Sequence, residues 1–171
     1  YGGSWPGVCD TNYTCFTDDF STTPLSTTNW VTSVSSGSYT PAIDSNNRLV
    51  LTQASTNQAT AVTLQRLFPT SGNIVTVEMD HGAWGGSGAD GLAMVLSDAS
   101  YTPRPGAFGG PLGYGFKTQA SGQSTTDISG FAGGWLGVGL DEYGMFSVQG
   151  GTSNISSRVA DSVAIRGSGS G

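Results

Sequence analysis

The segment GGWLGVGLDEYGMF, residues 133–146, joins an apolar, glycine-containing run to two adjacent acids, Asp141 and Glu142. Its first part, GWLGVGLD from Gly134, is short and keeps no helical period of 3.6 residues, which favours a strand. The sequence therefore predicts a strand ending near Asp141. The two acids could serve in catalysis, hold a metal or simply end that strand.

Similar runs recur along the chain, separated by turn-rich stretches of Gly, Ser, Asn and Pro. They are RLVLTQ from Arg48, TAVTLQRLF from Thr60, NIVTVEMD from Asn73, GLAMVLS from Gly91, MFSVQ from Met145 and DSVAIRG from Asp161. Residues 73–80 alternate between two faces, one of which carries Val75, Val77 and Met79 and suits a core. The pattern predicts an all-β fold, a sandwich of two antiparallel sheets.

The composition suits one compact domain over residues 1–171, with 27 Gly and 11% charged residues. No window reaches the roughly 18 consecutive apolar residues of a membrane span, and the first residues lack the basic and apolar regions of a signal peptide. The formal net charge is −6, and the basic residues are scattered singly. We expect neither nucleic-acid binding nor membrane insertion.

The two cysteines, Cys9 and Cys15, bracket the residues DTNYT. No other Cys and no nearby His completes a metal site, so the spacing favours a local disulfide that closes a small loop within an N-terminal segment, residues 1–15. Such a bond implies an oxidising, extracellular compartment. The alternative is a pair of reduced thiols.

Two long glycine-rich stretches flank the run that begins at Gly91: HGAWGGSGADG before it and SDASYTPRPGAFGGPLGYG after it. Glycine-rich loops in β folds often carry sites, because the backbone can approach a ligand closely. Their aromatic residues Trp84, Phe108 and Tyr114 are candidates for stacking on the apolar face of a sugar. The alternatives are solvent-exposed turns and simple packing.

Three stretches together, GADGLAMVLSDASYTPRPGAFGGPLGYGF, GFAGGWLGVGLDEYGMFS and DSVAIRGSGSG, resemble the concanavalin A-like (L-type lectin-like) domains of bacterial surface proteins. Within this family the chain is most similar in pattern to MshQ-like domains, which are associated with mannose-sensitive haemagglutinin pili. CFTDDF and TAVTLQRLFP fit the same pattern, so the resemblance runs from about Cys15 to the last residue. It implies a jelly-roll sandwich that binds carbohydrate beside a calcium ion.

The resemblance also implies particular site residues. Ala89-Asp90 resembles the cis-linked pair whose carboxylate accepts hydrogen bonds from sugar hydroxyls. GGPLGY, residues 109–114, resembles the loop whose backbone contacts the sugar, here at Gly109 and Gly110. With Trp84 and Tyr114, these residues make up the expected ligand site.

The expected metal site departs from the family pattern. Aligning VGLDEYGM with the family strand places Asp141 and the Tyr143 carbonyl at calcium ligands. Gly139 stands where the family has Glu, and Met145 stands where it has Asn. Calcium prefers about six to eight oxygen ligands. We therefore expect calcium to be bound weakly or not at all, with Glu142, Asp127 or water as replacement ligands.

The same departure bears on catalysis. Glycosidases of this fold carry alternate carboxylates on one strand, whereas here the position two before Asp141 is Gly139 and Glu142 points to the other side. The lone His81 lacks a GxSxG elbow, and GGSGADG lacks the Lys of a phosphate loop. We therefore expect that the chain is not an enzyme.

The sequence ends at IRGSGSG, where MshQ-like domains continue into further strands, so the resemblance implies a sandwich that lacks strands at its C-terminus. Other protein chains could supply them. The leading hypothesis is a carbohydrate-binding adhesion module of an extracellular bacterial surface protein or appendage, with a glycan or another cell-surface ligand as partner. The alternative is a structural subunit of a filament or pilus tip that has kept the sandwich without sugar binding.

Overall fold

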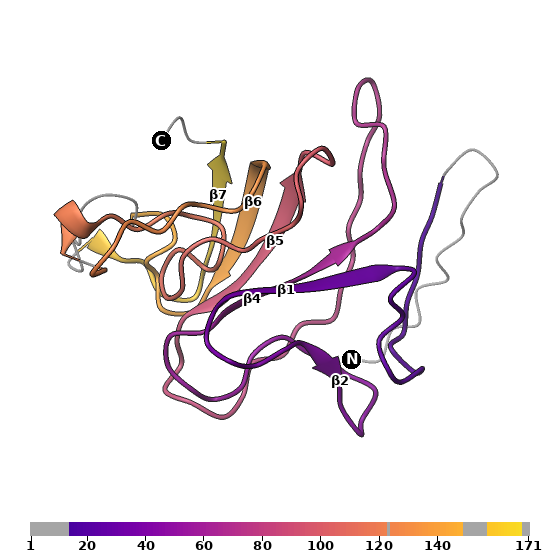
Figure 1. The fold of residues 1–171 in the computed structure, drawn as a ribbon, viewed down its shortest axis with the longest axis horizontal. Helices are drawn as coiled ribbons and strands as arrows, with labels where there is room; N and C mark the ends of the chain where they lie inside the picture. Colours follow the sequence, from indigo (N-terminus) through magenta and orange to yellow (C-terminus); the bar gives the residue numbers. More distant parts are fainter. Residues whose placement is uncertain (1–13, 123, 149–156, 169–171) are drawn as a thin grey trace.

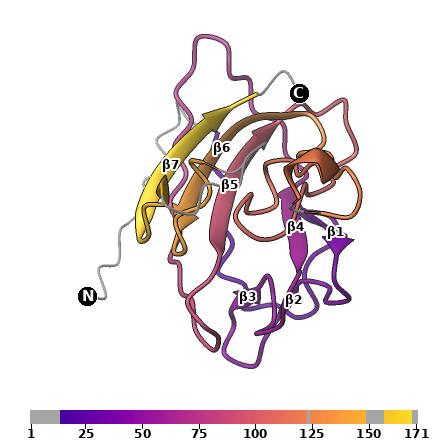
Figure 2. The same cartoon turned by 90° about the vertical axis from the view of Figure 1, so that its left-hand side faces the viewer.

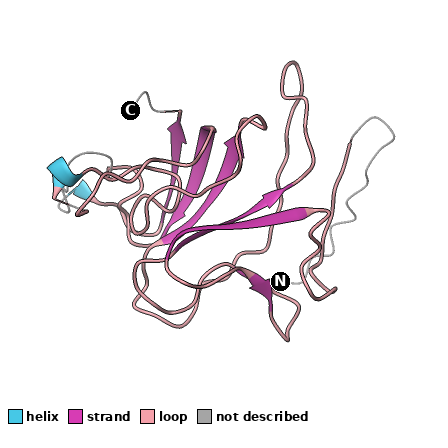
Figure 3. Cartoon of the chain, in the orientation of Figure 1, coloured by secondary structure: helices cyan, strands magenta, loops and turns pink. Residues whose placement is uncertain are grey.

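The structure, a computed structural model, describes residues 14–122, 124–148 and 157–168, and these residues form an antiparallel all-β arrangement with almost no helix; η1 (Gln119–Ser121) is a short 3-10 turn. The all-β prediction is confirmed, and the arrangement is consistent with a β-sandwich. Its strands are β1 (Trp30–Ser36), β2 (Ala42–Ile43), β3 (Leu49–Val50), β4 (Ala59–Leu64), β5 (Gly91–Ser97), β6 (Gly134–Asp141) and β7 (Ser162–Gly167). Figure 3 shows how much of the chain connects these short strands.

The largest sheet has the order β5-β6-β7 and is antiparallel throughout. Figure 2 shows its three strands side by side, with β4 and β1 beyond β5. Two residues in the middle of one face of β6 are glycines: a Cβ at Gly137 would lie 2.7 Å from the Tyr114 ring, and one at Gly139 would lie 2.5 Å from the Phe146 ring. The sequence alternates Gly with Leu or Val here because two aromatic rings cover the glycine face.

A second sheet pairs β1 with β4, from Trp30 opposite Leu64 to Ser36 opposite Ala59, with an irregularity between Val34 and Ser36. At the start of β1, the Trp30 Nε1–H donates to Asp18 Oδ2 at 2.8 Å. The rings of Phe16 and Phe20 pack against the Trp30 ring at centroid distances of 5.6 and 5.8 Å. The β2–β3 hairpin forms a third, two-stranded sheet.

The stretch from residue 105 to residue 117 connects the two larger sheets. Towards β1, the Ser35 hydroxyl donates to the Gly106 carbonyl at 2.7 Å. Towards β7, the Tyr114 hydroxyl donates to the Gly167 carbonyl at 3.0 Å. The buried apolar residues of the described chain centre on this stretch and on the end of β6: Ala59, Ala107, Tyr114, Met145 and Phe146. Figure 1 shows the connecting loops beside the β5-β6-β7 sheet.

Two predicted strands are wrong. Residues 73–80 have no strand pairing, and Ile74 and Val77 expose 91% and 52% of their surface, because the alternating pattern finds no sheet edge among the described residues. The run from Met145 is a turn whose Met145 and Phe146 are buried. Conversely, β1 was not predicted, although WVTSVSS carries the β-branched residues typical of a strand.

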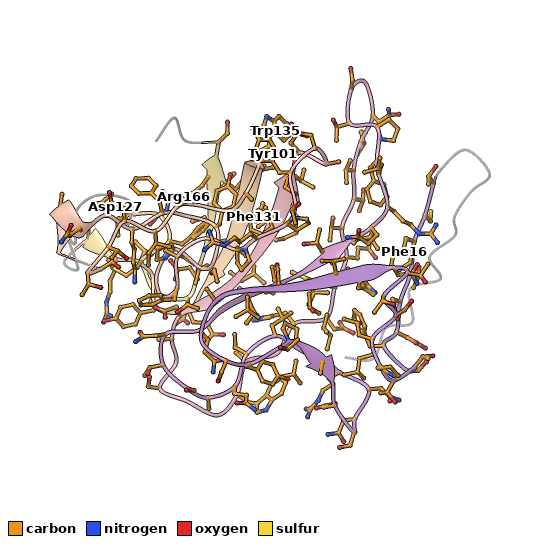
Figure 4. The ribbon with its side chains drawn as sticks, in the orientation of Figure 1. Phe16, Tyr101, Asp127, Phe131, Trp135 and Arg166 are labelled. Atoms are coloured by element: carbon orange, nitrogen blue, oxygen red, sulfur yellow. The ribbon has the colours of Figure 1, made fainter. Side chains whose placement is uncertain are left out.

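Aromatic side chains also gather at the start of β6. The Tyr101 ring lies against Gly133 and the Phe131 side chain against Gly134. Figure 4 shows Tyr101 and Trp135 at this end of the sheet. Trp135 is 60% exposed, although its run of apolar neighbours indicates a core residue. Cys9 lies outside the described residues, so the disulfide with Cys15 stays a prediction.

Candidate functional site

The candidate site forms where β5 begins and the stretch 105–117 passes it. Asp90 immediately precedes β5, and the peptide bond between Ala89 and Asp90 is cis, as the resemblance implies. Gly109 has a φ of +77°, a region that glycine occupies without steric cost. A Cβ at Gly109 would lie 3.8 Å from Asp90 Oδ2 and 3.1 Å from Lys117 Nζ. A carboxylate and an ammonium group therefore face each other across a position with no side chain.

Lys117 is held in place by its surroundings. Its backbone N–H donates to the Ile128 carbonyl at 3.0 Å, and its carbonyl accepts from the Ile128 N–H at 2.8 Å. Its ammonium nitrogen lies 3.9 Å from the centroid of the Phe108 ring, a cation–π contact. The residue is 7% exposed. The charge is therefore fixed beside Asp90 and does not move freely in solvent.

Burial shifts both charged groups toward neutrality. Burial raises the pKa of Asp90, Lys117 opposes the shift, and the negative charge of Asp141 adds to it. Burial lowers the pKa of Lys117, and Asp90 opposes that shift. No ion pair between them is formed within the described ranges, where the one salt bridge joins Arg48 to Asp44. Both groups thus retain hydrogen-bonding capacity for a ligand.

Asp141 lies opposite Gly91 at the end of β6 and is 1% exposed. Its carboxylate accepts hydrogen bonds from the backbone N–H of Gly144 at 2.8 Å and of Phe146 at 2.5 Å. The Asp90 carbonyl accepts from the N–H groups of Glu142 and Tyr143 at 3.0 and 3.1 Å. Asp141 therefore orders the turn after β6 and joins it to Asp90.

This arrangement does not fit a calcium ion. Both carboxylate oxygens of Asp141 are directed at backbone N–H groups, and the side chain of Met145, which carries no oxygen, is buried. Tyr143 carries the Arg158 guanidinium over its ring at 4.2 Å, which adds positive charge nearby. No group of three or more His, Cys, Asp or Glu gathers in the described part of the chain. The expected replacement ligand Asp127 instead accepts the N–H of Gln119 at 2.7 Å.

The remaining expected ligand residues lie apart from Asp90. Gly110 is buried. Tyr114 is also buried, with its ring over Gly137, which leaves no exposed ring for stacking. Trp84 is 60% exposed, but its ring carries the Arg48 guanidinium at 4.4 Å, on the side of the β2–β3 hairpin. The structure thus brings Asp90 and Gly109 together and uses Tyr114 for the core.

A cavity of about 340 Å³ is open to solvent, and its lining residues Arg104, Asp127 and Ser129 are exposed. Phe108, whose ring contacts the Lys117 ammonium, is one of its walls. Most of its other lining side chains carry hydroxyl or charged groups, including Ser35 and Asp127. The sequence analysis missed Lys117 and this cavity. The available signal was that Lys117 is the single lysine of the chain and follows the GGPLGY loop closely.

Comparison with known proteins identifies no relative, since no family model, no curated protein and no solved structure matches the chain. Within the residues that the structure places, no helix has the length and apolar character needed to cross a bilayer.

Proposed function

We propose that this chain is a carbohydrate-binding, lectin-like module of an extracellular bacterial surface protein, built on a concanavalin A-like jelly roll. The observation that carries the proposal is the placement of Asp90 and Lys117 across Gly109. A sugar hydroxyl both donates and accepts hydrogen bonds. One hydroxyl over Gly109 can donate to the Asp90 carboxylate and accept from the Lys117 ammonium.

The energetics of the pair favour such a ligand. Each group is partly removed from water, and neither is neutralised by a direct ion pair among the described residues. Hydrogen bonds to charged groups are worth about 1.5–3 kcal/mol, roughly twice those between neutral groups. Binding at this position needs no metal, so the Asp141 turn acts by holding the Asp90 backbone in place.

Titration calorimetry against a panel of neutral oligosaccharides tests the proposal. We expect binding that Asp90→Asn weakens by about 10- to 100-fold, the equivalent of one charge-assisted hydrogen bond. Asp161→Asn is the matched control, because Asp161 is exposed and its φ of 52° suits Asn equally well. Absence of glycan binding by folded protein would refute the proposal, as would equal effects of the two variants.

A second candidate function is a structural subunit of an extracellular filament. The observation that favours it is the free edge of β7, the last strand of its sheet in the described chain, where Val163 and Ile165 expose 67% and 71% of their surface. An unpaired edge with exposed apolar residues invites a strand from another chain. Residues 73–80, which alternate like a strand without pairing, are a suitable donor from a second copy.

Light scattering over a range of concentrations separates the two candidates. A subunit forms ordered polymers, and a lysine at the edge, Ile165→Lys, should abolish them. Val159→Lys is the control, since Val159 is 59% exposed but lies outside the sheet. A discrete monomer at all concentrations would exclude the subunit function.

A further inference from the structure

The cavity beside Phe108 has features that the Asp90 cluster alone does not explain. Three segments line it: the end of β1, residues 104–108 and residues 126–129. Its side chains include a cation, a carboxylate, four hydroxyls and one aromatic ring, from Arg104, Asp127, Ser35, Ser36, Thr126, Ser129 and Phe108. Its volume of about 340 Å³ lies at the small end of the range for ligand pockets, roughly 300–1,000 Å³.

Arg104 is the decisive lining residue. No ion pair or side-chain hydrogen bond of its guanidinium is found within the ranges that the structure describes, although Asp127 lines the same cavity. Asp127 instead uses Oδ1 to accept the N–H of Gln119 at 2.7 Å. The cavity lining therefore includes a planar, two-pronged donor, and Asp127, the carboxylate in the same lining, accepts the Gln119 N–H and forms no ion pair with Arg104.

The lining groups together specify a ligand chemistry. A guanidinium recognises a carboxylate by two parallel hydrogen bonds. The hydroxyls of Thr126 and Ser129 can exchange hydrogen bonds with ring hydroxyls. The Ser35 hydroxyl already donates to the Gly106 carbonyl, so it can only accept from the sugar. The Phe108 ring suits the apolar face of a pyranose.

We propose that the cavity binds an acidic sugar residue, a hexuronate, with its carboxylate on Arg104 and its ring against Phe108. This inference rests on the proposed carbohydrate-binding function and specifies its ligand class. The Phe108 ring also contacts the Lys117 ammonium, so the cavity and the Asp90 cluster share this side chain. The preferred ligand is therefore a glycan with at least two residues, a hexuronate in the cavity and a neighbour whose hydroxyl reaches Asp90.

The test compares a hexuronate-containing disaccharide with its methyl ester by titration calorimetry on the full chain. The ester keeps the sugar shape but removes the negative charge. We expect the acid to bind about 10- to 100-fold more tightly than the ester, the ratio of a charge-assisted bidentate contact. Arg104→Gln should erase this difference by weakening the acid alone.

Arg66→Gln is the matched control. Arg66 lies 4.8 Å over the ring of Phe16, which Figure 4 places at the opposite side of the molecule from Asp127. The control variant should keep the preference for the acid. A measurement without any variant checks the same point: added NaCl should weaken binding of the acid more than binding of the ester.

The outcomes distinguish this inference from the proposed function. Equal affinity for acid and ester, with both weakened by Asp90→Asn, overturns the acidic-sugar inference and leaves carbohydrate binding intact. Retention of the acid preference in folded Arg104→Gln also overturns it. Binding of neither disaccharide, together with no binding of neutral oligosaccharides, overturns both.

Discussion

The two glycine-rich loops on either side of β5 look alike in sequence and differ in structure. In residues 81–90, a Cβ at Gly86 or Gly88 would meet no atom within 4 Å. In residues 104–117, a Cβ at Gly106 would lie 2.6 Å from the Gly115 carbonyl oxygen and 2.9 Å from the backbone of Gly130. The first loop is a surface feature, whereas the second is packed between two sheets.

Glycine therefore has a different structural role in each loop. In the exposed loop, glycine provides turns with little tertiary consequence. In the packed loop, it lets backbone lie directly against backbone, and the aromatic ring of Tyr114 fills the space over Gly137. Asp90 closes the first loop and Gly109 belongs to the second, so the candidate site lies where an exposed loop meets a packed one.

The largest expected effect compares the aromatic residues of the two loops. Tyr114→Ala should lower the free energy of unfolding by about 3–5 kcal/mol, because it empties a buried ring position and removes the hydrogen bond to Gly167. Trp84→Ala should change it by less than about 0.5 kcal/mol, as for most exposed sites. Urea unfolding measures both, and similar values would show that the loops do not differ.

A smaller change in stability is expected when two glycines are replaced, neither of which has a left-handed φ. Gly106→Ala should cost about 1–3 kcal/mol, because its Cβ must displace backbone atoms that cannot rotate away. Gly82→Ala should be nearly neutral, since its Cβ would meet only the Trp84 ring, at 3.4 Å. Thermal melts of the two variants check the contrast. A neutral Gly106→Ala would mean that the packed loop can move.

The pH dependence examines the boundary at Asp90. Burial raises the pKa of Asp90 above its ordinary 3.8, with Lys117 opposing and Asp141 reinforcing the shift. Sugar binding needs the carboxylate, so affinity should fall, by about tenfold per pH unit, as the pH drops below that raised pKa. Calorimetry in a pH series measures the midpoint, and a midpoint at or below 3.8 would contradict the burial of the site.

Stability should depend on the same group with the opposite sign. A raised folded-state pKa means that the folded protein binds the proton more tightly than the unfolded chain does. The stabilising contribution of Asp90 is therefore fully present below pH 3.8 and is lost as the pH rises through the folded-state value. Subtracting the stability curve of Asp90→Asn from that of the wild type isolates this contribution from the other carboxylates.

The smallest expected effect is that of calcium. Since the Asp141 oxygens already hold two backbone N–H groups, we expect at most millimolar affinity. At about 1 mM calcium such a site adds only about 0.4 kcal/mol, or roughly 1–2 °C in the thermal midpoint. Scanning calorimetry with calcium and with EDTA measures the shift. An increase of many degrees would show that other oxygens complete a site at the turn after β6.

Part of the candidate site could be predicted from the sequence. Asp90 and Gly109 were expected because ADGLAM and GGPLGY resemble two elements of the lectin-like family, and such short motifs can be read from neighbouring residues. Lys117 and the cavity at Arg104 were not predicted, since they depend on contacts between segments far apart in the chain. Tyr114 was expected at the ligand site but lies in the core. An aromatic residue in a glycine-rich loop suits either role, and only the residues around it in space decide which.

Local sequence determined the all-β class and the placement of β4, β5, β6 and β7, because β-branched runs and glycine turns are properties of neighbouring residues. Tertiary structure alone decided that residues 73–80 stay unpaired, although they alternate as regularly as any strand. A strand needs a partner edge to satisfy its backbone hydrogen bonds, and no local pattern specifies that edge. Gly139 is a second example. Its position on a strand follows from neighbouring residues, but only the Phe146 ring packed against it explains why a side chain such as a carboxylate does not fit there.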